Sequence, residues 1–314
     1  MRKCRFIDLF AGIGGTRLGF ELAGCECVFS SEWDKFAQQT YAANFCEISE
    51  GNITKIESRT IPNHDILVAG FPCQPFSIPG VVKRNSLNKP HGFDDLVQGT
   101  MYFEIYRILK EKRPRSFFLE NVRHLKRHNQ GRTFEIIMKS LTEDLGYTVS
   151  HSIIDSSNLV PQHRERIYIV GFRKPTRFSF PKLKDRRPIL RDILEDRVPD
   201  KYILSDHLWN YLQQYAAKHK ERGNGFGYGL ATLDGITRTL TARYYKDGSE
   251  ILVPRTNGNP RRLTPRECAR LMGFPDSFKI PVSDLQAYKQ FGNSVVVPVI
   301  ETIAKSMTLA LSRT

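Results

Sequence analysis

The sequence predicts an α/β protein that carries a second, smaller and irregular part. Short apolar runs typical of strands alternate with segments of helical periodicity as far as Phe172, which is the pattern of a mainly parallel sheet covered by helices. Beyond that residue, prolines and alternating glycines interrupt a charged stretch. An apolar, helix-like segment follows at 295–311, so we expect the chain to return there to its first core.

Each element of the first part has its own signal. The apolar runs predict strands at 5–10, 26–31, 66–69, 116–119 and 167–172. Helical periodicity predicts helices at 16–23, 34–45, 101–110, 133–145 and 295–311. Asp34 is a suitable N-cap for the second helix, because its short carboxylate can accept from the free amides of a first turn. Gly146 is expected to end the fourth helix.

The later part of the chain predicts a different organisation. Four prolines punctuate it without any sustained period, at Pro175, Pro181, Pro188 and Pro199, and from Gly223 to Gly229 every second residue is glycine. We therefore predict a discontinuous first domain, made of residues 1–180 and 285–314. Residues 181–284 are predicted to form a hinge and an irregular or β second domain.

Composition and charge indicate the class of partner. The 314 residues are 40% hydrophobic and carry a formal net charge of +14, which favours a polyanion such as nucleic acid over a merely basic surface. Basic and aromatic residues gather in one late segment, as a nucleic-acid face requires: Arg238, Arg243, Tyr244, Tyr245, Lys246, Arg255, Arg261 and Arg262.

Three further features narrow the setting. The six cysteines include no Cys-x-x-Cys pair and no zinc spacing, so we predict no metal and a reduced, cytoplasmic environment. No run approaches the ~20 consecutive apolar residues of a membrane span. The basic first residues precede only a short strand-like run, so we expect no signal peptide and no membrane partner.

A glycine-rich turn between the first strand and the first helix predicts a cofactor site. Residues 10–15 read FAGIGG, and glycines at such a turn let the backbone and a helix N-terminus approach a ligand closely. Alone this signal is weak, because many sharp turns are glycine-rich for packing. The second strand ends at Glu32, where an acid can accept from ribose hydroxyls.

Three polar motifs at strand ends predict chemistry. Cys73 follows the strand at 66–69 in GFPCQPFS, a placement that suits a nucleophile, although a lone cysteine is more often a small buried hydrophobe. Glu120 ends the strand in FFLENV and could instead be a structural carboxylate. Arg164 and Arg166 alternate in QHRERIYIVG, so both side chains can reach one anionic site, or can lie on a solvated face beside Glu165.

Together these segments resemble the DNA cytosine-5 methyltransferases. FIDLFAGIGG, GFPCQPFS, FFLENV and QHRERIYIVG are similar to their cofactor, cysteine, glutamate and arginine motifs, and RRLTPRECARLMGFPDSF and YKQFGNSVVVPVI resemble their last two. The matches run in family order over nearly the whole chain. KRNSLNKPHGF at 83–93 and the insert at 223–253 further resemble the Dcm-type branch of bacterial modification methylases.

The resemblance implies a Rossmann-like S-adenosylmethionine-dependent methyltransferase sheet with a smaller target-recognition domain. By motif match Phe10 stacks on the adenine, Glu32 takes the ribose and Trp33 packs beside it, although a core position would otherwise be expected for a tryptophan. The other cofactor residues that it implies are Gly12, Gly14, Asn52, Ile53, Pro72, Met101, Asn293, Ser294 and Val295. Asn52 is a departure, because relatives commonly have aspartate there to hold the adenine amine.

The resemblance also implies roles in catalysis and in DNA binding. Cys73 would add to carbon 6 of cytosine, Glu120 would meet ring nitrogen 3, and Arg164 and Arg166 would reach the cytosine carbonyl oxygen and a neighbouring phosphate. The base would be extruded from the duplex under a loop at 77–93. The DNA-binding residues expected are Gln74, Ser77, Gln162, Arg238, Thr239, Arg243 and Tyr244.

The leading interpretation is a monomeric DNA (cytosine-5-)-methyltransferase that modifies a short palindrome in a CC…GG frame. A functional pairing with a restriction endonuclease goes with that branch. One alternative is an RNA methyltransferase of related motif order, but the long basic insert from Lys174 to Arg262 favours sequence reading on DNA. Another is a nucleic-acid-binding regulator with an inactive fold, which the intact motif residues argue against. The base that removes the carbon-5 proton has no candidate.

Overall fold

A six-stranded sheet forms the centre of the molecule. The computed structural model describes residues 3–72 and 101–313. The strand order is β2 (Glu26–Ser31), β1 (Arg5–Leu9), β3 (Ile66–Gly70), β4 (Ser116–Val122), β6 (Glu165–Phe172) and β5 (Thr148–Asp155). The first four strands are parallel to their neighbours, whereas β6 runs antiparallel to β4, and β5 antiparallel to β6.

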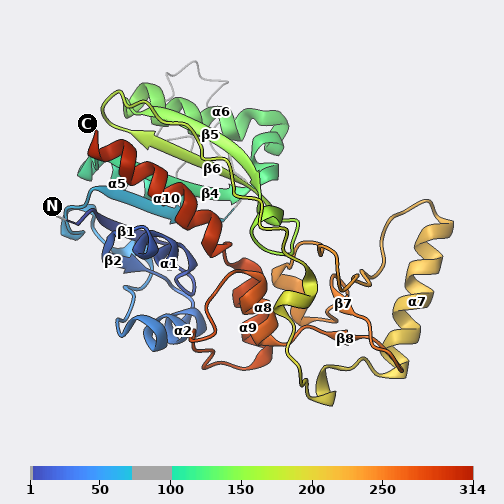
Figure 1. The fold of residues 1–314 in the computed structure, drawn as a ribbon. Helices are drawn as coiled ribbons and strands as arrows, with labels where there is room; N and C mark the ends of the chain where they lie inside the picture. The colour runs from blue at the N-terminus through green and yellow to red at the C-terminus, as the bar shows by residue number, and fades with distance from the viewer. Residues whose placement is uncertain (1–2, 73–100, 314) are drawn as a thin grey trace.

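Helices cover both faces of this sheet, which explains why its central strands are mostly apolar (Figure 1). On one face, Ile66 and Val68 pack in a core with α1 (Gly15–Leu22) and α10 (Val297–Ser312). On the other face, Leu67 and Ala69 pack with α5 (Met101–Lys112) and α6 (Arg132–Lys139). The α/β class and the five strands predicted from the sequence are therefore confirmed.

The differences from the predicted elements have local causes. The prediction missed β5, an edge strand whose sequence TVSHSIID lacks the continuous apolar run of its neighbours. The fourth helix is α6, and a π turn at Ser140–Asp144 extends it up to Leu145. Asp34 does cap α2 (Lys35–Phe45), accepting from the Ala37 amide at 2.8 Å. Gly146 takes a left-handed φ of 71° after the π turn.

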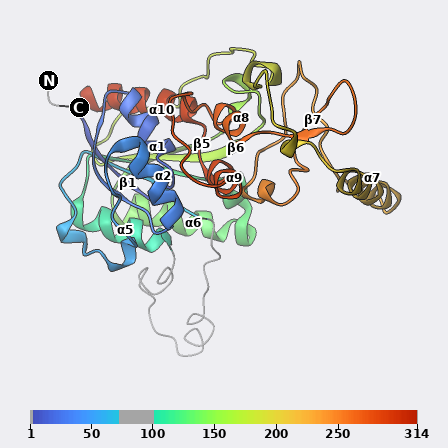
Figure 2. The same ribbon diagram turned by 90° about the horizontal axis from the view of Figure 1, so that it is seen from below.

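The later part of the chain is irregular, as predicted, but it is not mainly β. Its strands β7 (Leu252–Val253) and β8 (Arg261–Arg262) have two residues each. The longest element there is α7 (Asp206–Glu221), a 16-residue helix that the sequence analysis missed. Its apolar residues Leu208, Trp209 and Leu212 form a small cluster away from the main core. Figure 2 shows α7 at the end of the molecule opposite the sheet.

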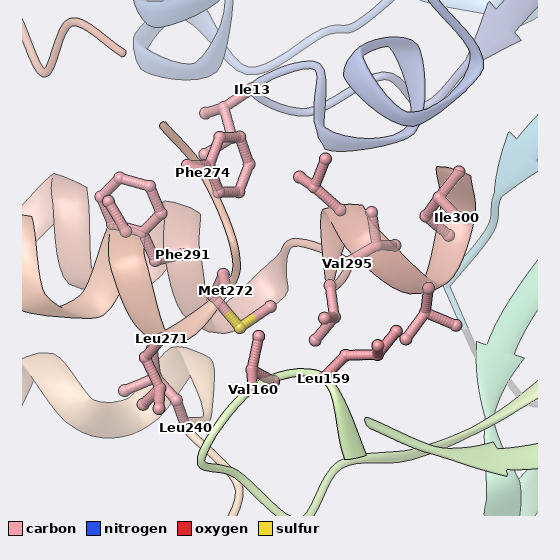
Figure 3. Close-up of a cluster of buried hydrophobic side chains, with 14 of the residues drawn as sticks. Ile13, Leu159, Val160, Leu240, Leu271, Met272, Phe274, Phe291, Val295 and Ile300 are labelled. Carbon is pink, nitrogen blue, oxygen red and sulfur yellow. The ribbon is translucent and has the colours of Figure 1, made fainter. Parts of the chain in front are cut away.

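One core connects the sheet to the later part (Figure 3). Leu159 and Val160, which precede β6, pack in the same cluster as Leu240 and as Leu271 of α8 (Pro265–Leu271). The cluster continues into α9 (Asp284–Asn293) and α10. In the described residues, 284–312 is long and apolar enough to cross a membrane by length and composition, but these are α9 and α10, whose apolar residues are buried in this core.

Candidate active site

A cleft of about 770 Å³ opens at the carboxyl ends of β1 to β4, where ligands of open parallel sheets bind. Predicted cofactor residues line it, namely Phe10, Gly12, Glu32, Trp33, Asn52, Ile53, Pro72, Met101, Asn293, Ser294 and Val295. The same cleft is lined by Glu120, Arg164 and Arg166. The sheet thus brings most of the predicted cofactor residues and three of the four predicted catalytic residues to one place.

Glu32 fastens the glycine-rich turn to the end of β2. One carboxylate oxygen accepts from the Gly12 amide at 2.8 Å, and the other accepts from the Trp33 and Asp34 amides, each at 2.8 Å. Burial raises the pKa of Glu32, and the backbone amides oppose that rise. Phe10, the first residue of the turn, is held in a left-handed conformation with φ 57°, which is the kind of local strain that functional turns retain.

Three predicted cofactor residues differ from expectation in detail. Gly14 does not line the cleft: it is the N-cap of α1 with φ 85°, and the Phe45 ring occupies the space where a side chain would lie. Trp33 is 78% exposed, so the alternative of a core tryptophan is wrong. The Asn52 side-chain oxygen accepts from the Thr54 amide at 3.0 Å, leaving one lone pair for a ligand.

Glu120 lies one strand away from the cofactor end of the cleft. It pairs in register with Gly70, the last residue of β3, and its side chain is buried. The Arg166 Nε lies 3.1 Å from the Glu120 carboxylate. Burial raises the pKa of Glu120, while the charges of Arg166 and Arg164 oppose that rise. A carboxyl in this balance can exchange a proton with a bound ligand.

The sequence analysis missed a second polar residue on β4. Asn121 is buried, and its side-chain amide donates to the Phe71 carbonyl at 2.9 Å. This bond joins the end of β4 to the segment that leads into Cys73. Cys73 itself lies outside the described residues, as does the loop at 77–93. The only signal for Asn121 was its position next to Glu120 at a strand end.

Arg164 is placed differently from Arg166. It precedes β6, is buried, and donates to three backbone carbonyls: Leu240 at 2.8 Å, Gly292 at 3.0 Å and Ser294 at 2.6 Å. Desolvation lowers the pKa of Arg164 to about 9, and the nearby Arg166 adds to the effect. Arg164 therefore joins the sheet to the later part of the chain, and its Nε finds no hydrogen-bond partner among residues 3–72 and 101–313.

Comparisons with known proteins agree with this geometry. The family described as C-5 cytosine-specific DNA methylase matches residues 4–309. The chain belongs to that family. It is 53% identical to the Type II methyltransferase M.SsoII of Shigella sonnei over 317 residues, covering 98% of this chain and 81% of the relative. It is 48% identical to the DNA-cytosine methyltransferase of Escherichia coli strain K12, covering 96% and 76%.

The fold is also that of solved methyltransferases. The Entamoeba histolytica methyltransferase EhMeth superposes with a TM-score of 0.78 at 22% identity, covering 99% of both chains. The S. pombe Dnmt2 methyltransferase superposes with a TM-score of 0.77 at 18% identity, covering 99% of both chains. At these identities the likeness shows the fold alone. The family membership makes this chain a DNA-cytosine methyltransferase.

Within this DNA methylase, two of the predicted DNA-binding residues are buried. Tyr244 has no exposed surface, and its hydroxyl donates to the Ile251 carbonyl at 2.7 Å while accepting from the Leu263 amide at 2.8 Å. Gln162 is also fully buried and accepts from the Leu240 amide at 2.7 Å. Both side chains are tied into the protein core, so their contact with DNA stays a prediction.

Other predicted DNA-binding residues lie in three environments. Thr239 is half-buried and donates to the His163 carbonyl at 2.5 Å, which attaches its segment to the start of β6. Arg238 and Arg243 are exposed. Gln74 and Ser77 lie outside the described residues. Among residues 3–72 and 101–313, no group of three or more metal-ligating side chains converges.

Proposed function

We propose that this methylase transfers a methyl group from S-adenosylmethionine to carbon 5 of a cytosine that has left a DNA duplex. The observation that carries the proposal is the shared cleft. Residues suited to an adenosyl group line the same 770 Å³ cleft as the Glu120–Arg166 pair, next to Pro72. Chain connectivity keeps Cys73 beside Pro72, so the nucleophile, the acid and the methyl donor can meet there.

The residues of the cleft fit S-adenosylmethionine. Phe10, Trp33 and Ile53 offer apolar surface for an adenine ring, and the Glu32 carboxylate keeps acceptor capacity for ribose hydroxyls beyond its three backbone bonds. The Asn52 side-chain oxygen can accept from the adenine amine beside its bond to Thr54. When bound, S-adenosylmethionine supplies a sulfonium methyl group that a carbon nucleophile can attack.

The chain's own groups make carbon 5 of the base nucleophilic. The Cys73 thiolate forms a bond to carbon 6, which breaks the 5,6 double bond of the ring. Glu120, whose pKa is raised by burial, donates a proton to ring nitrogen 3 as charge develops there. Arg166 holds the Glu120 carboxyl and faces the same cleft. Loss of the carbon-5 proton and expulsion of Cys73 then restore the aromatic ring.

The proposed DNA site is a short palindrome in a CC…GG frame. Two exposed arginines in the segment resembling the Dcm-type branch support it, because Arg238 and Arg243 can each form a bidentate contact to guanine. The alternative is that each arginine contacts a phosphate and no base, which would add affinity without sequence discrimination. The site frame, action as a monomer in the cytoplasm and protection against a restriction nuclease belong to the same proposal.

The test compares DNA with RNA as acceptor. Tritium transfer from labelled S-adenosylmethionine to plasmid DNA is expected, with little transfer to RNA. Bisulfite sequencing of plasmid DNA from a methylation-free host that expresses the protein is expected to place 5-methylcytosine at the inner cytosine of the CC…GG frame. Methylation centred on another frame would remove the site assignment and leave the enzyme class. Transfer to RNA alone would overturn the DNA assignment.

The matched variant is Cys73→Ser. It is expected to lose methyl transfer by several orders of magnitude and to keep DNA binding, because a hydroxyl is a far weaker nucleophile than a thiolate and is nearly the same size. S-adenosylhomocysteine binding, measured by calorimetry, serves as the control for an intact cleft. A Cys73→Ser protein that methylates DNA at a normal rate would exclude Cys73 as the nucleophile.

A further inference from the structure

The helix α7 has no place in the chemistry, and its contacts with the main core are few. Within the helix only Leu212 is fully buried. Figures 1 and 2 both show it standing apart from the sheet and its covering helices. A 16-residue helix in such a position needs a reason beyond core packing, and its neighbour in sequence is the segment at 223–230. That segment, GNGFGYGL, is called here the glycine segment.

The glycine segment is fixed to α7 at both of its ends. Near its start, the Asn224 amide donates to the His219 carbonyl at 2.8 Å, and the Phe226 ring lies 5.4 Å from the His219 ring. Near its end, the Tyr228 ring lies 4.7 Å from the Trp209 ring. Both pairs meet edge to face, an arrangement in which aromatic rings attract each other. The helix therefore holds a segment that forms no helix or strand of its own.

The alternating glycines of this segment lie in two different environments. A Cβ atom at Gly227 would lie 3.0 Å from the Ala216 Cβ of α7, so the segment approaches the helix more closely than a side chain allows. At Gly225 a Cβ atom would meet nothing within 4 Å. The alternation thus presses one glycine against α7 and leaves another facing open space, where a ligand backbone can approach.

The glycine segment also packs against the side chain of Arg238. A Cβ atom at Gly229 would lie 3.2 Å from the Arg238 Cδ and closer still to the Glu250 carbonyl oxygen. The Gly229 amide donates to Ser249 at 2.7 Å, and the Leu252 amide donates to Gly229 at 2.8 Å. The segment is therefore packed between α7 and residues 249–252, with the stem of the exposed Arg238 against its far end.

We propose that α7 is a positioning helix for sequence discrimination: Ala216 and His219 set the path of the glycine segment, and through it the position of Arg238 toward DNA. The proposal rests on the proposed function, because it assigns the segment to the DNA-reading face of a methylase. Ala216 and His219 touch no base in this account. They act through the backbone of residues 224–229.

The first experiment compares two neighbouring alanines of α7. Ala216→Leu should push the glycine segment away, whereas Ala217→Leu adds the same side chain at an exposed position, and leucine keeps the helix propensity in both. The measurement is kcat/KM on a duplex with the preferred site and on duplexes with one base pair changed. Discrimination is kcat/KM on the preferred site divided by kcat/KM on a changed site. Ala216→Leu is expected to reduce this ratio by about tenfold, which is the size of the loss of one base contact. For Ala217→Leu the same ratio should stay within about twofold of wild type, because an exposed leucine there does not displace the glycine segment.

The second experiment tests the contact itself. Gly227 does not have a positive φ, so Gly227→Ala is strained only by its clash with Ala216. Gly227→Ala is expected to lower discrimination, and Gly227→Ala with Ala216→Gly is expected to restore it, because removing the Ala216 methyl reopens the space. Restoration would show that the loss in Gly227→Ala comes from the contact with Ala216 and not from a general loss of folding, because Ala216→Gly by itself weakens the helix α7.

The outcomes separate this proposal from the proposed function. S-adenosylhomocysteine affinity and total methylation of the preferred site by wild type report on the enzyme class and are independent of α7. If wild type discriminates between duplexes and Ala216→Leu discriminates as well as Ala217→Leu, α7 does not position the reading segment. If the double variant is no better than Gly227→Ala alone, the Ala216–Gly227 contact does not set the path.

Discussion

The carboxyl end of the sheet, called here the sheet edge, and the proposed DNA-reading segments within residues 223–253 are held in place in different ways. At the sheet edge, Glu120 is placed by strand register beside Gly70, and Glu32 is held by three backbone amides. In the later part, the glycine segment is held by ring contacts and by single hydrogen bonds to α7. A reacting group must be fixed within a fraction of an ångström. The glycine segment, which we propose helps to read DNA, can be repositioned by changing the side chains that support it.

The first prediction tests whether a buried acid in the sheet lowers the free energy of unfolding, whereas an exposed acid in the later part of the chain does not. Asp8 on β1 is fully buried, and burial raises its pKa to about 7, although a hydrogen bond from Thr16 and the charge of Arg17 oppose the rise. The folded pKa lies above the unfolded one, so stability is lost as pH rises between about 4 and 7. Asp8→Asn should be more stable than wild type above pH 7, by up to about 4 kcal/mol.

Urea unfolding at pH 5 and pH 8 measures this difference. The gap between Asp8→Asn and wild type is expected to widen with pH. Asp234→Asn is a control in the later part, because the Asp234 side chain is exposed and its hydrogen bond with Arg191 lowers its pKa. If the difference in free energy of unfolding between Asp8→Asn and wild type were the same at both pH values, the pKa of Asp8 would not be raised in the folded protein.

The second prediction concerns the acid of the sheet edge. Glu120→Gln keeps the shape of the side chain but cannot donate the proton that ring nitrogen 3 needs, so turnover should fall on the order of 100-fold or more. S-adenosylhomocysteine affinity should hardly move. In wild type, turnover should also fall as pH rises through the raised pKa of Glu120, and this limb should be absent from the variant. Normal turnover by Glu120→Gln would remove the residue from the mechanism.

The third prediction distinguishes the two possible roles of the exposed arginines. If Arg238 reads a guanine, Arg238→Ala should relax one position of the site at about 1–3 kcal/mol. If it holds a phosphate, all sites should weaken alike and the salt dependence should become shallower. Arg243→Ala is the matched variant, because Arg243 is also exposed, whereas it is the Arg238 stem that lies near Gly229. Methylation profiles on a library of duplexes at two salt concentrations separate the two roles.

The smallest expected effect is at the cofactor end of the cleft. Asn52→Asp should tighten the binding of S-adenosylhomocysteine by up to about 1 kcal/mol, if a neutral bond to the adenine amine becomes charge-assisted. Aspartate can still cap the turn at Thr54, as the Asn52 oxygen now does. Calorimetry measures the change. Unchanged or weaker binding would mean that residue 52 does not face the adenine amine.

The sequence predicts the sheet edge better than the reading segments for a physical reason. Buried parallel strands need continuous apolar runs, and such runs at β1, β3 and β4 locate Glu120 and the glycine-rich turn from the sequence alone. Gln162 and Tyr244 show the limit for the later part, because a polar side chain in a basic, aromatic segment suggests DNA, whereas in the structure each satisfies a buried backbone group. The helix α7 was missed because its apolar face contacts only a small cluster.

Covalent trapping tests the central claim most directly. A duplex with 5-fluorocytosine at the inner cytosine of the CC…GG frame cannot release a proton from carbon 5 after methyl transfer, so the adduct should persist in the presence of S-adenosylmethionine. Digestion and mass spectrometry of the complex are expected to locate the modified base on Cys73. A stable complex whose modified peptide lacks Cys73 would contradict the mechanism, as would the absence of any covalent complex with an enzyme that methylates the unmodified duplex.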